Sequence, residues 1–114
     1  MIIQIPYPKR KSEWSEYGLN AYYAGKHWSK RKQDALFWHW LVRKYAPRAM
    51  IKGEVGILFK WNDNLDLSNH AVMGKMIEDA LIGYLIQGDS RKYVKKITHE
   101  WHDQDYIEVQ VYAI

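Results

Sequence analysis

The sequence predicts a single α+β domain over residues 1–114, in which a mixed β-sheet packs with two helices in the order β-α-β-α-β-β. Three observations support this fold class. The chain of 114 residues is long enough to bury one hydrophobic core but not two. Its hydrophobic content of 47%, with six Trp and nine Tyr, is typical of a folded protein rather than a disordered one. Segments with strand-like alternation and segments with helical periodicity follow one another along the chain.

The first half of the chain is predicted to contain a short strand, a long loop and a helix. Residues 2–5 are apolar enough for a strand, which Pro6 would end. Residues 9–28 are polar and aromatic without a regular period, so we expect a loop, and loops of this length usually have a function. Ser29 is a suitable N-cap for a helix whose apolar stripe continues to Tyr45.

The second half is predicted to contain a strand, an amphipathic helix and two further strands. Residues 54–61 form an apolar segment of strand length. Residues 68–85 have the three- and four-residue periodicity of a helix with one buried face. Residues 93–101 and 106–112 are predicted strands, and residues 102–105 form the turn between them. The apolar face of the helix consists of Val72, Met73, Met76, Ile77, Ala80, Leu81, Tyr84 and Leu85.

Charge is distributed unevenly between the two halves of the sequence. Residues 1–52 contain eleven Lys and Arg against three Asp and Glu, whereas residues 53–114 contain six against ten. A basic half beside an acidic half is expected of a protein that holds a polyanion on one surface and a metal ion on another. A mildly basic charge is equally compatible with an ordinary small domain, so both interpretations stay open on charge alone.

The composition also excludes several classes of site and location. The chain has no cysteine, which excludes a disulfide framework and a thiolate zinc site. No apolar segment approaches the roughly 20 residues of a membrane span, and the N-terminus lacks the pattern of a signal peptide. We therefore expect a cytoplasmic protein with no membrane partner and no small-molecule cofactor.

The polar residues around the predicted amphipathic helix suggest a metal site. Asp66 and Asp89 lie beyond its two ends, and Asn69, Lys75 and Asp79 share one side of it. Carboxylates that meet at one place are what Mg²⁺ requires, because this ion takes oxygen ligands and keeps several waters. The segment is therefore a candidate site for metal-dependent phosphate chemistry.

Each of these residues also has a plain structural interpretation. Asp66 could cap the helix, since aspartate is common at helix N-termini. Lys75 and Asp79 could form an ordinary i,i+4 ion pair, and Asp89 could be a turn residue. His70, a single histidine at the helix start, is interpreted as partly exposed polar surface and not as a ligand.

A second group of residues is predicted to bind nucleic acid. Residues 26–32 place several positive charges at a helix N-terminus, where the helix dipole disfavours them unless an anion lies nearby. A phosphate backbone would supply that anion, and Trp28 or Tyr23 could stack on an unpaired base. A solvated basic surface with buried aromatic residues is an equally good interpretation. The candidate DNA-binding residues are Arg10, Tyr23, Lys26, His27, Lys30, Arg31 and Lys92.

Taken in order, these motifs resemble those of the RusA-like Holliday junction resolvases, small phage and prophage endonucleases. The matching elements are Ile5-Pro6-Tyr7-Pro8, Asn20-Ala21-Tyr22-Tyr23, Asp66-Leu67-Ser68-Asn69, Lys75, Asp79-Ala80-Leu81 and Gly88-Asp89. Two family aspartates are replaced, by Ser68 and by Gly88. Lys75 also lies six residues beyond Asn69, where the family usually has three.

The resemblance implies a homodimer that binds a four-way DNA junction and nicks two strands symmetrically, in DNA recombination and repair. The reaction would be phosphodiester hydrolysis that depends on Mg²⁺, with Mn²⁺ able to substitute. The catalytic residues carried over in this way are Asp66, Asn69, Lys75, Asp79 and Asp89. Asp66 and Asp89 would be metal ligands, and Asp79 would fill the gap that Ser68 leaves.

Two other functions stay open from the sequence. The replacements at Ser68 and Gly88 are compatible with a catalytically impaired protein of the same fold that binds junctions or single-stranded DNA. A weaker alternative is a small basic protein that binds RNA or a protein partner. A nuclease should bind Mg²⁺ or Mn²⁺, whereas the catalytically impaired protein need not. The small basic protein should show no preference for branched DNA.

Overall fold

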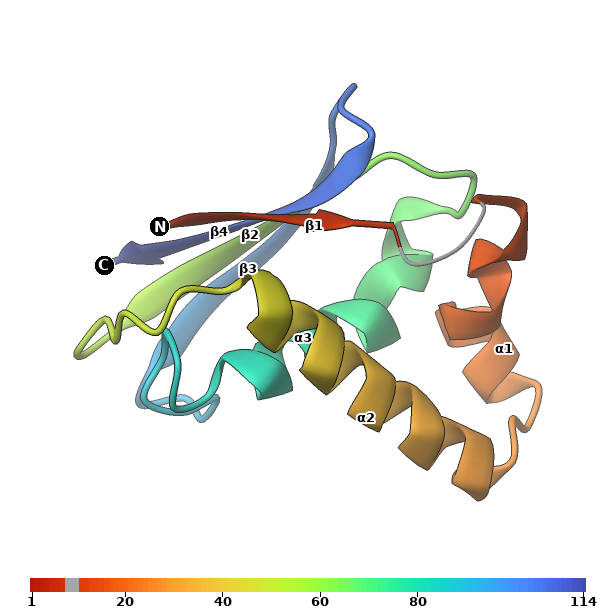
Figure 1. Cartoon of the computed structure of the whole chain (residues 1–114), viewed down its shortest axis with the longest axis horizontal. Helices are drawn as coiled ribbons and strands as arrows, with labels where there is room; N and C mark the ends of the chain where they lie inside the picture. The colour runs from red at the N-terminus through yellow and green to blue at the C-terminus, as the bar shows by residue number, and fades with distance from the viewer. Residues whose placement is uncertain (8–10) are drawn as a thin grey trace.

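A four-stranded mixed sheet, with the two longest helices on one of its faces, forms the framework of the protein (Figure 1). This computed structural model describes residues 1–7 and 11–114, without the side chains of residues 11–13. The strand order is β1-β4-β2-β3, where β2 is parallel to β3 and antiparallel to β4, and β4 is antiparallel to β1. The predicted α+β class with a mixed sheet is confirmed. The strands are β1 (Ile2–Pro6), β2 (Val55–Trp61), β3 (Val94–Trp101) and β4 (Tyr106–Ala113).

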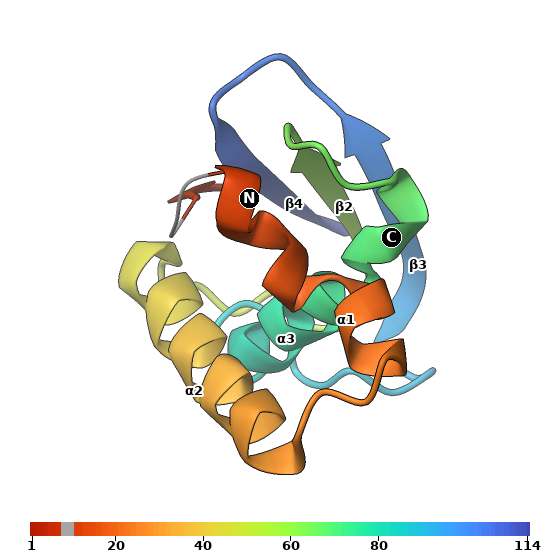
Figure 2. The same cartoon turned by 90° about the vertical axis from the view of Figure 1, so that its right-hand side faces the viewer.

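The last two strands are consecutive in sequence but do not pair with each other. Both pair with β2, which lies between them, so residues 102–105 cross the end of β2 rather than close a hairpin (Figure 2). The backbone N–H of His102 donates to the carbonyl oxygen of Trp61 at 3.1 Å. This hydrogen bond ties the crossing segment to the strand that it passes.

The core lies between the sheet and the helices. Alternate residues of a strand point to the same face, and in β1, β2 and β4 those that face the helices are almost completely buried. The alternation predicted for residues 106–112 is confirmed, because Ile107, Val109 and Val111 have no exposed surface. The other inward residues of β1, β2 and β4 are Ile3, Ile5, Val55, Ile57, Phe59 and Trp61.

The segment predicted as a long loop contains helical structure instead. A 3-10 helix, η1 (Lys11–Tyr17), is followed by the short helix α1 (Leu19–Tyr23), so the described residues contain three α-helices rather than the two predicted. Trp14 is fully buried and makes an edge-to-face contact with Trp38, with ring centroids 5.5 Å apart. The prediction was wrong because these elements depend on tertiary aromatic contacts and not on a local period.

The helix predicted from Ser29 to Tyr45 is α2 (Trp28–Tyr45). Its N-cap is His27, two residues before the predicted Ser29, and His27 Nδ1 accepts a hydrogen bond from the Ser29 N–H at 3.2 Å. Trp38, Leu41 and Val42 are the buried residues of α2.

The helix predicted over residues 68–85 is shorter than expected. It starts as a 3-10 helix, η2 (Leu67–His70), and continues as α3 (Ala71–Leu81). Beyond Leu81 the chain turns at Gly83, whose φ of 80° lies in the left-handed region that glycine adopts most easily. Leu85 is buried as its apolar character predicts, but from the turn after α3 rather than from the helix.

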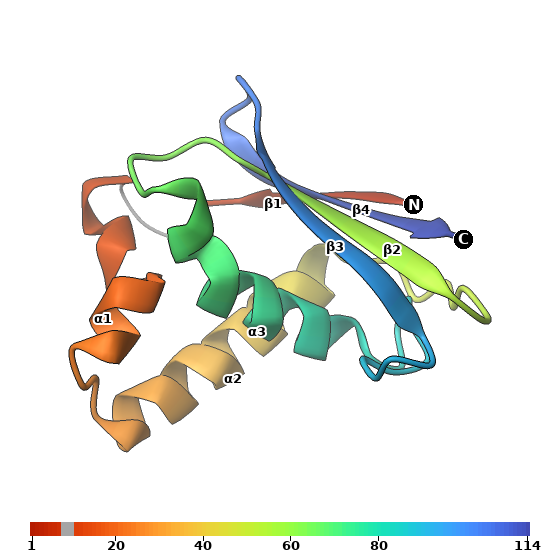
Figure 3. The ribbon, with the colours of Figure 1, turned by 180° about the vertical axis from the view of Figure 1, so that it is seen from behind.

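The described residues form one compact body with a radius of gyration of 13.6 Å, close to the roughly 13 Å expected for a domain of this size. Seen from behind, α2 and α3 lie under the sheet, and α1 lies beyond one end of it (Figure 3). Among the described residues, no helix is both long enough and apolar enough to cross a bilayer.

Candidate functional site

Helix α3 and the turn after it bring three of the predicted catalytic residues together. Lys75 and Asp79 lie one turn apart on the same side of α3, and Lys75 Nζ donates to Asp79 Oδ1 at 2.8 Å. The same ammonium group donates to Asp89 Oδ2 at 2.6 Å, although Asp89 lies fourteen residues further along the chain. The turn at residues 82–93 therefore folds Asp89 back against α3.

A fourth residue, Glu78, belongs to the same group and was missed from the sequence. Its Oε1 lies 3.5 Å from Lys75 Nζ, and only 4% of the residue is exposed. Carboxylate oxygens of Glu78, Asp79 and Asp89 all lie within 4.8 Å of one another. The three-residue step from Lys75 to Glu78 is the signal that could have found it. We call Lys75, Glu78, Asp79 and Asp89 the acidic cluster.

The pKa values within the acidic cluster are shifted by burial and by Lys75. Burial raises the pKa of the Glu78 carboxyl above its ordinary value. The hydrogen bond from Lys75 lowers the pKa of Asp89. Burial alone would lower the pKa of Lys75, but its hydrogen bonds to Asp79 and Asp89 outweigh burial, so the net pKa lies above the ordinary value. Lys75 therefore stays positively charged and acts as the counterion of three carboxyl groups.

The donor set of the acidic cluster fits a hard divalent cation. Three carboxylate oxygens lie close together. Those of Asp79 and Asp89 are accessible, because both side chains are at least one-third exposed, whereas Glu78 is buried. Mg²⁺ and Mn²⁺ prefer such oxygen ligands. The ammonium group of Lys75 now neutralises these carboxylates, so a cation that binds them must compete with it.

Replacing Lys75 by Gln is expected to tighten Mn²⁺ and Mg²⁺ binding by about tenfold, which corresponds to roughly 1.4 kcal/mol. The reason is that the variant loses the positive charge competing for the same carboxylates. Isothermal titration calorimetry with Mn²⁺ measures the change. Lys95→Gln is the matched control, since Lys95 lies on β3 and its Nζ is 4.0 Å from Glu54. If neither the Lys75 variant nor the unmodified protein binds Mn²⁺, the acidic cluster is only an ion-pair network.

Asp66 and Ser68 lie at the opposite end of the helical segment from Asp79. Asp66 occupies the N-cap position of η2, and its side chain is exposed and makes no capping hydrogen bond. Asp79 lies in the last turn of α3, about 12 Å further along the axis than Ala71. The group of close carboxylate oxygens among the described residues does not include Asp66. The structure therefore places Asp66 apart from Asp79, although both were predicted to bind the same metal ion.

Gly88 stands where the resemblance expects an aspartate, and the structure gives a reason for the smaller residue. A side chain at Gly88 would place its Cβ 2.9 Å from Cδ2 of the Tyr93 ring. The turn that carries Asp89 is packed too closely against Tyr93 for a larger residue at this position.

Asn69 is used to hold α1 in place. Its Oδ1 accepts a hydrogen bond from the backbone N–H of Asn20 at 2.8 Å, and only 9% of the residue is exposed. Gly18, at the N-cap position of α1, has no side chain to satisfy that N–H. A Cβ on Gly18 would lie 2.8 Å from Asn69 Nδ2, so the glycine makes this close approach possible. Asn69 therefore caps α1 from a distant part of the chain.

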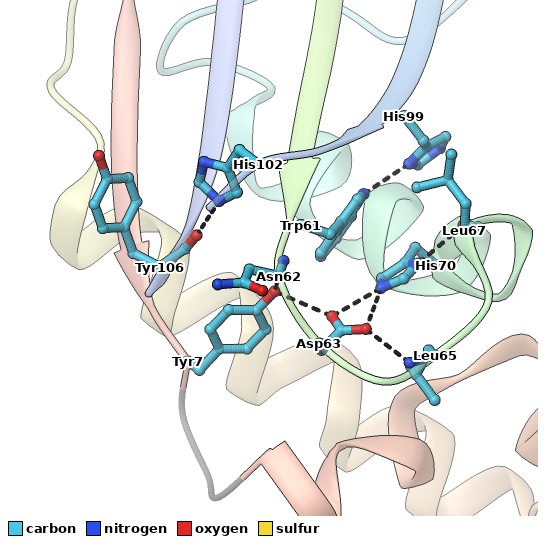
Figure 4. Close-up of polar contacts among 10 residues, drawn as sticks. All are labelled: Tyr7, Trp61, Asn62, Asp63, Leu65, Leu67, His70, His99, His102 and Tyr106. Atoms are coloured by element: carbon cyan, nitrogen blue, oxygen red, sulfur yellow. Dashed lines mark hydrogen bonds and ion pairs between the residues drawn. The ribbon is translucent and has the colours of Figure 1, made fainter. Parts of the chain in front are cut away.

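His70, interpreted from the sequence as partly exposed polar surface, is completely buried, so that prediction was wrong. Its Nε2 lies 2.9 and 2.8 Å from the two carboxylate oxygens of Asp63, and its Nδ1 lies 2.9 Å from the carbonyl oxygen of Leu67 (Figure 4). A carboxylate and a carbonyl oxygen can only accept hydrogen bonds. Both ring nitrogens therefore donate, and His70 and Asp63 form a buried ion pair.

Asp63 also holds the segment that carries Asp66. Its carboxylate accepts hydrogen bonds from the Tyr7 hydroxyl and from the Leu65 N–H, both at 3.0 Å. The Tyr7 oxygen in turn accepts from the Asn62 N–H at 2.6 Å. Burial raises the pKa of the Tyr7 hydroxyl, which keeps it protonated as a donor. These bonds fix residues 62–70 at the carboxyl end of β2.

Two aromatic contacts complete the surroundings of His70. The Trp61 ring stacks on His70 with centroids 4.4 Å apart, and Trp61 Nε1 donates to His99 Nδ1 at 3.0 Å. Burial lowers the pKa of His99, and the nearby positive charge of His70 lowers it further. His99 is therefore the neutral acceptor and His70 the charged donor of this pair of histidines.

Several of the predicted DNA-binding residues make contacts within the protein. Lys26 Nζ donates to the carbonyl oxygen of Glu16 at 2.7 Å and forms an ion pair with Asp34. His27 is occupied as the N-cap of α2. Tyr23, Lys30 and Lys92 are exposed, with Tyr23 at 80%. Arg10 lies outside the described residues.

Arg31 links the basic N-terminal half to the acidic cluster. Its guanidinium donates to the carbonyl oxygens of Lys26 at 2.7 Å and Tyr22 at 3.0 Å, which leaves its charge unneutralised by these partners. Arg31 and Lys75 line the same cavity of about 300 Å³. The other residues of its wall are Tyr22, Ala35, Ala71, Val72 and Met76.

Comparison with family models, with curated proteins and with solved structures found no match to this chain.

Proposed function

We propose that this protein is a Mg²⁺-dependent, structure-specific endodeoxyribonuclease that resolves four-way DNA junctions by symmetric phosphodiester hydrolysis. One observation carries the proposal. Lys75, Asp79 and Asp89, which the resemblance to RusA-like resolvases selects from separate parts of the sequence, converge within hydrogen-bonding distance and are joined by Glu78. As in that family, the protein would act as a homodimer in DNA recombination and repair.

Each member of the acidic cluster has a role in this proposal. Asp79 and Asp89, with Glu78, would hold Mg²⁺ or Mn²⁺, which when bound neutralises negative charge on the scissile phosphate. Binding of the cation would release Lys75 from its carboxylate partners. Its flexible ammonium group would then contact a phosphate oxygen and stabilise the charge that develops there.

The DNA would approach along the surface shared by α1, α2 and α3. Arg31 and Lys75 line one cavity there, and the exposed Lys30 and Tyr23 belong to the same N-terminal half with its excess of positive charge. Lys and Arg that replace condensed counterions on DNA make binding weaker as salt increases. The exposed Tyr23 ring offers a surface on which an unpaired base at the junction can stack.

The direct test is cleavage of a synthetic four-way junction compared with a linear duplex of the same sequence. We expect paired, symmetric nicks in the junction with Mg²⁺ or Mn²⁺, none with a chelator, and little cleavage of the duplex. Sequencing gels with each strand labelled in turn measure the position and symmetry of the nicks. Absence of nicks with both metals, in a protein that still binds the junction, contradicts the proposed nuclease.

A binding protein without nuclease activity is the second candidate, and the position of Asp66 favours it. Asp66 is not among the close carboxylates, and exposed Ser68 stands where the resemblance expects another ligand. In such a protein, Lys75 would remain paired with Asp79 and Asp89 permanently. Mobility-shift titrations with and without Mg²⁺ distinguish the candidates, since only the nuclease needs the metal for its activity.

A further inference from the structure

Helix α2 has large apolar residues on two opposite faces. Trp38 and Val42 are fully buried in the core. Leu36 and Trp40, on the outward face, are 64% and 58% exposed, and Trp28, at the start of the helix, is 71% exposed. A helix in a monomeric domain usually carries charged and polar residues on its outer face, so this second apolar face needs a partner.

The outward residues follow a four-residue step that is self-complementary. Trp28, Lys32, Leu36, Trp40 and Lys44 form one i±4 ridge along α2. Leu36 is the central residue of the ridge. At equal distances on either side of it, Lys32 corresponds to Trp40 and Trp28 corresponds to Lys44, so each lysine has a tryptophan at the equivalent position. A two-fold interface requires this property, because the same surface must match itself after rotation.

We propose that the outward face of α2 is a homodimer interface, in which two copies of α2 cross on a two-fold axis at Leu36. Leu36 would pack against the partner subunit's Leu36. Lys32 would lie over the partner subunit's Trp40, and Lys44 would approach the partner subunit's Trp28. An ammonium group over a tryptophan face is a favourable cation–π contact, and Lys44 already lies 5.2 Å from the Trp40 ring within one chain.

The surface beside the ridge is hollowed as helix packing requires. One hollow of about 250 Å³, lined by Lys32, Ala35, Leu36, His39, Met76 and Asp79, lies between α2 and α3 and borders the acidic cluster. A second, of about 490 Å³, is lined by Leu36, His39, Trp40, Arg43 and Lys44. When i±4 ridges of two helices interdigitate, the side chains of one fill the grooves of the other, and the axes cross at about −50°.

Charge selects the register centred on Leu36. If the axis passed between Leu36 and Trp40 instead, Lys32 would face the partner subunit's Lys44, and like charges would repel. In the proposed register each of these lysines meets an aromatic ring. The face as a whole remains basic, so added salt should strengthen the dimer by screening repulsion, whereas salt weakens DNA binding.

The size of the face indicates a modest affinity. With 18 residues, α2 is about 27 Å long, and a helix with its side chains is about 10–12 Å wide. This strip is smaller than the roughly 800 Å² per partner of a standard interface. We therefore expect a dissociation constant in the micromolar range. The proposed function requires a dimer, but self-association is measured without DNA or metal, so the two proposals fail separately.

Sedimentation velocity over about 1–100 μM tests the interface. We expect a monomer–dimer equilibrium that shifts toward dimer as salt is raised. Leu36→Lys should raise the dissociation constant at least tenfold, because it adds two like charges at the axis. The residue is exposed, so the monomer should keep its fold. Ile97→Lys is the matched control, the same change at a 46% exposed position on the edge strand β3.

The absence of cysteine from the sequence allows a geometric test. A single cysteine in Leu36→Cys should form an intermolecular disulfide on mild oxidation, because only residues near the axis come within disulfide distance of themselves. Ile97→Cys should not. A monomer at every concentration overturns the inference, as does loss of the dimer in Ile97→Lys but not in Leu36→Lys. If Leu36→Lys weakens junction binding without changing self-association, the face contacts DNA instead.

Discussion

Replacement of Asp63 by Ala is expected to lower the free energy of unfolding by about 3–5 kcal/mol. The reason is that Asp63 is the buried counterion of His70 and also accepts hydrogen bonds from Tyr7 and the Leu65 N–H. Without it, a positively charged imidazole remains in the core without its counterion, and the Tyr7 hydroxyl and the Leu65 N–H each lose this acceptor. Urea unfolding followed by tryptophan fluorescence measures the loss, since Trp61 stacks directly on His70.

Two further variants separate the ion pair from a general effect of losing an aspartate. Asp103→Ala removes an exposed carboxylate from the segment between β3 and β4 and should change stability by no more than about 0.5 kcal/mol. Adding His70→Phe to Asp63→Ala should recover part of the loss, because no unpaired charge then remains in the core. A loss below about 1 kcal/mol in Asp63→Ala would mean that His70 is not charged.

Replacement of Asp89 by Asn is expected to reduce the rate of junction cleavage by about 10²- to 10³-fold. The hydrogen bond from Lys75 lowers the pKa of Asp89, so its carboxylate is fully ionised at neutral pH, and the amide removes both the charge and a metal-binding oxygen. Single-turnover cleavage measures the chemical step free of product release. Higher Mn²⁺ concentrations should recover part of the rate if the lost oxygen was a metal ligand.

Asp103→Asn, which removes a similarly exposed carboxylate, should cleave at the unmodified rate. A second variant, Asp66→Asn, tests whether Asp66 or the acidic cluster is needed for cleavage. Loss of cleavage in Asp66→Asn with normal cleavage in Asp89→Asn would place the metal at η2 rather than at the acidic cluster. Loss in both would mean that DNA or a second subunit brings the two ends of the helical segment into one site.

The parts of the fold with a regular period could be predicted from the sequence. The alternation of residues 106–112 and the apolar stripe of α2 follow from geometry that is local to each element. The helix predicted over residues 68–85 was too long because Leu85 continues the apolar period after the helix has ended. The elements within residues 9–28 were missed because Trp14 is stabilised by contacts with the aromatic rings of Tyr7 and Trp38, which no local period describes.

In the candidate site too, contacts within one helix could be predicted from the sequence, whereas contacts between distant segments could not. Lys75 and Asp79 could be paired from their four-residue spacing alone, and Glu78 lies on the same side of α3. The contact of Asp89 with Lys75 depends on the turn at residues 82–93, which no periodicity describes. The burial of His70 was not predictable, because the carboxylate that compensates its charge comes from a loop seven residues earlier in the chain.

The pairing of β1 with β4 has a consequence for how the protein folds. Residue 2 lies opposite residue 110, so β1 finds its neighbour only after residues 106–113 of β4 have been synthesised. Until then, the apolar side chains of β1 have no sheet to join, and the nascent chain presents them to solvent or to a chaperone. Closing so long a loop is also entropically costly, which favours slow, late docking of this strand. We therefore expect a ribosome-bound chain stopped before residue 106 to keep its first strand accessible to protease.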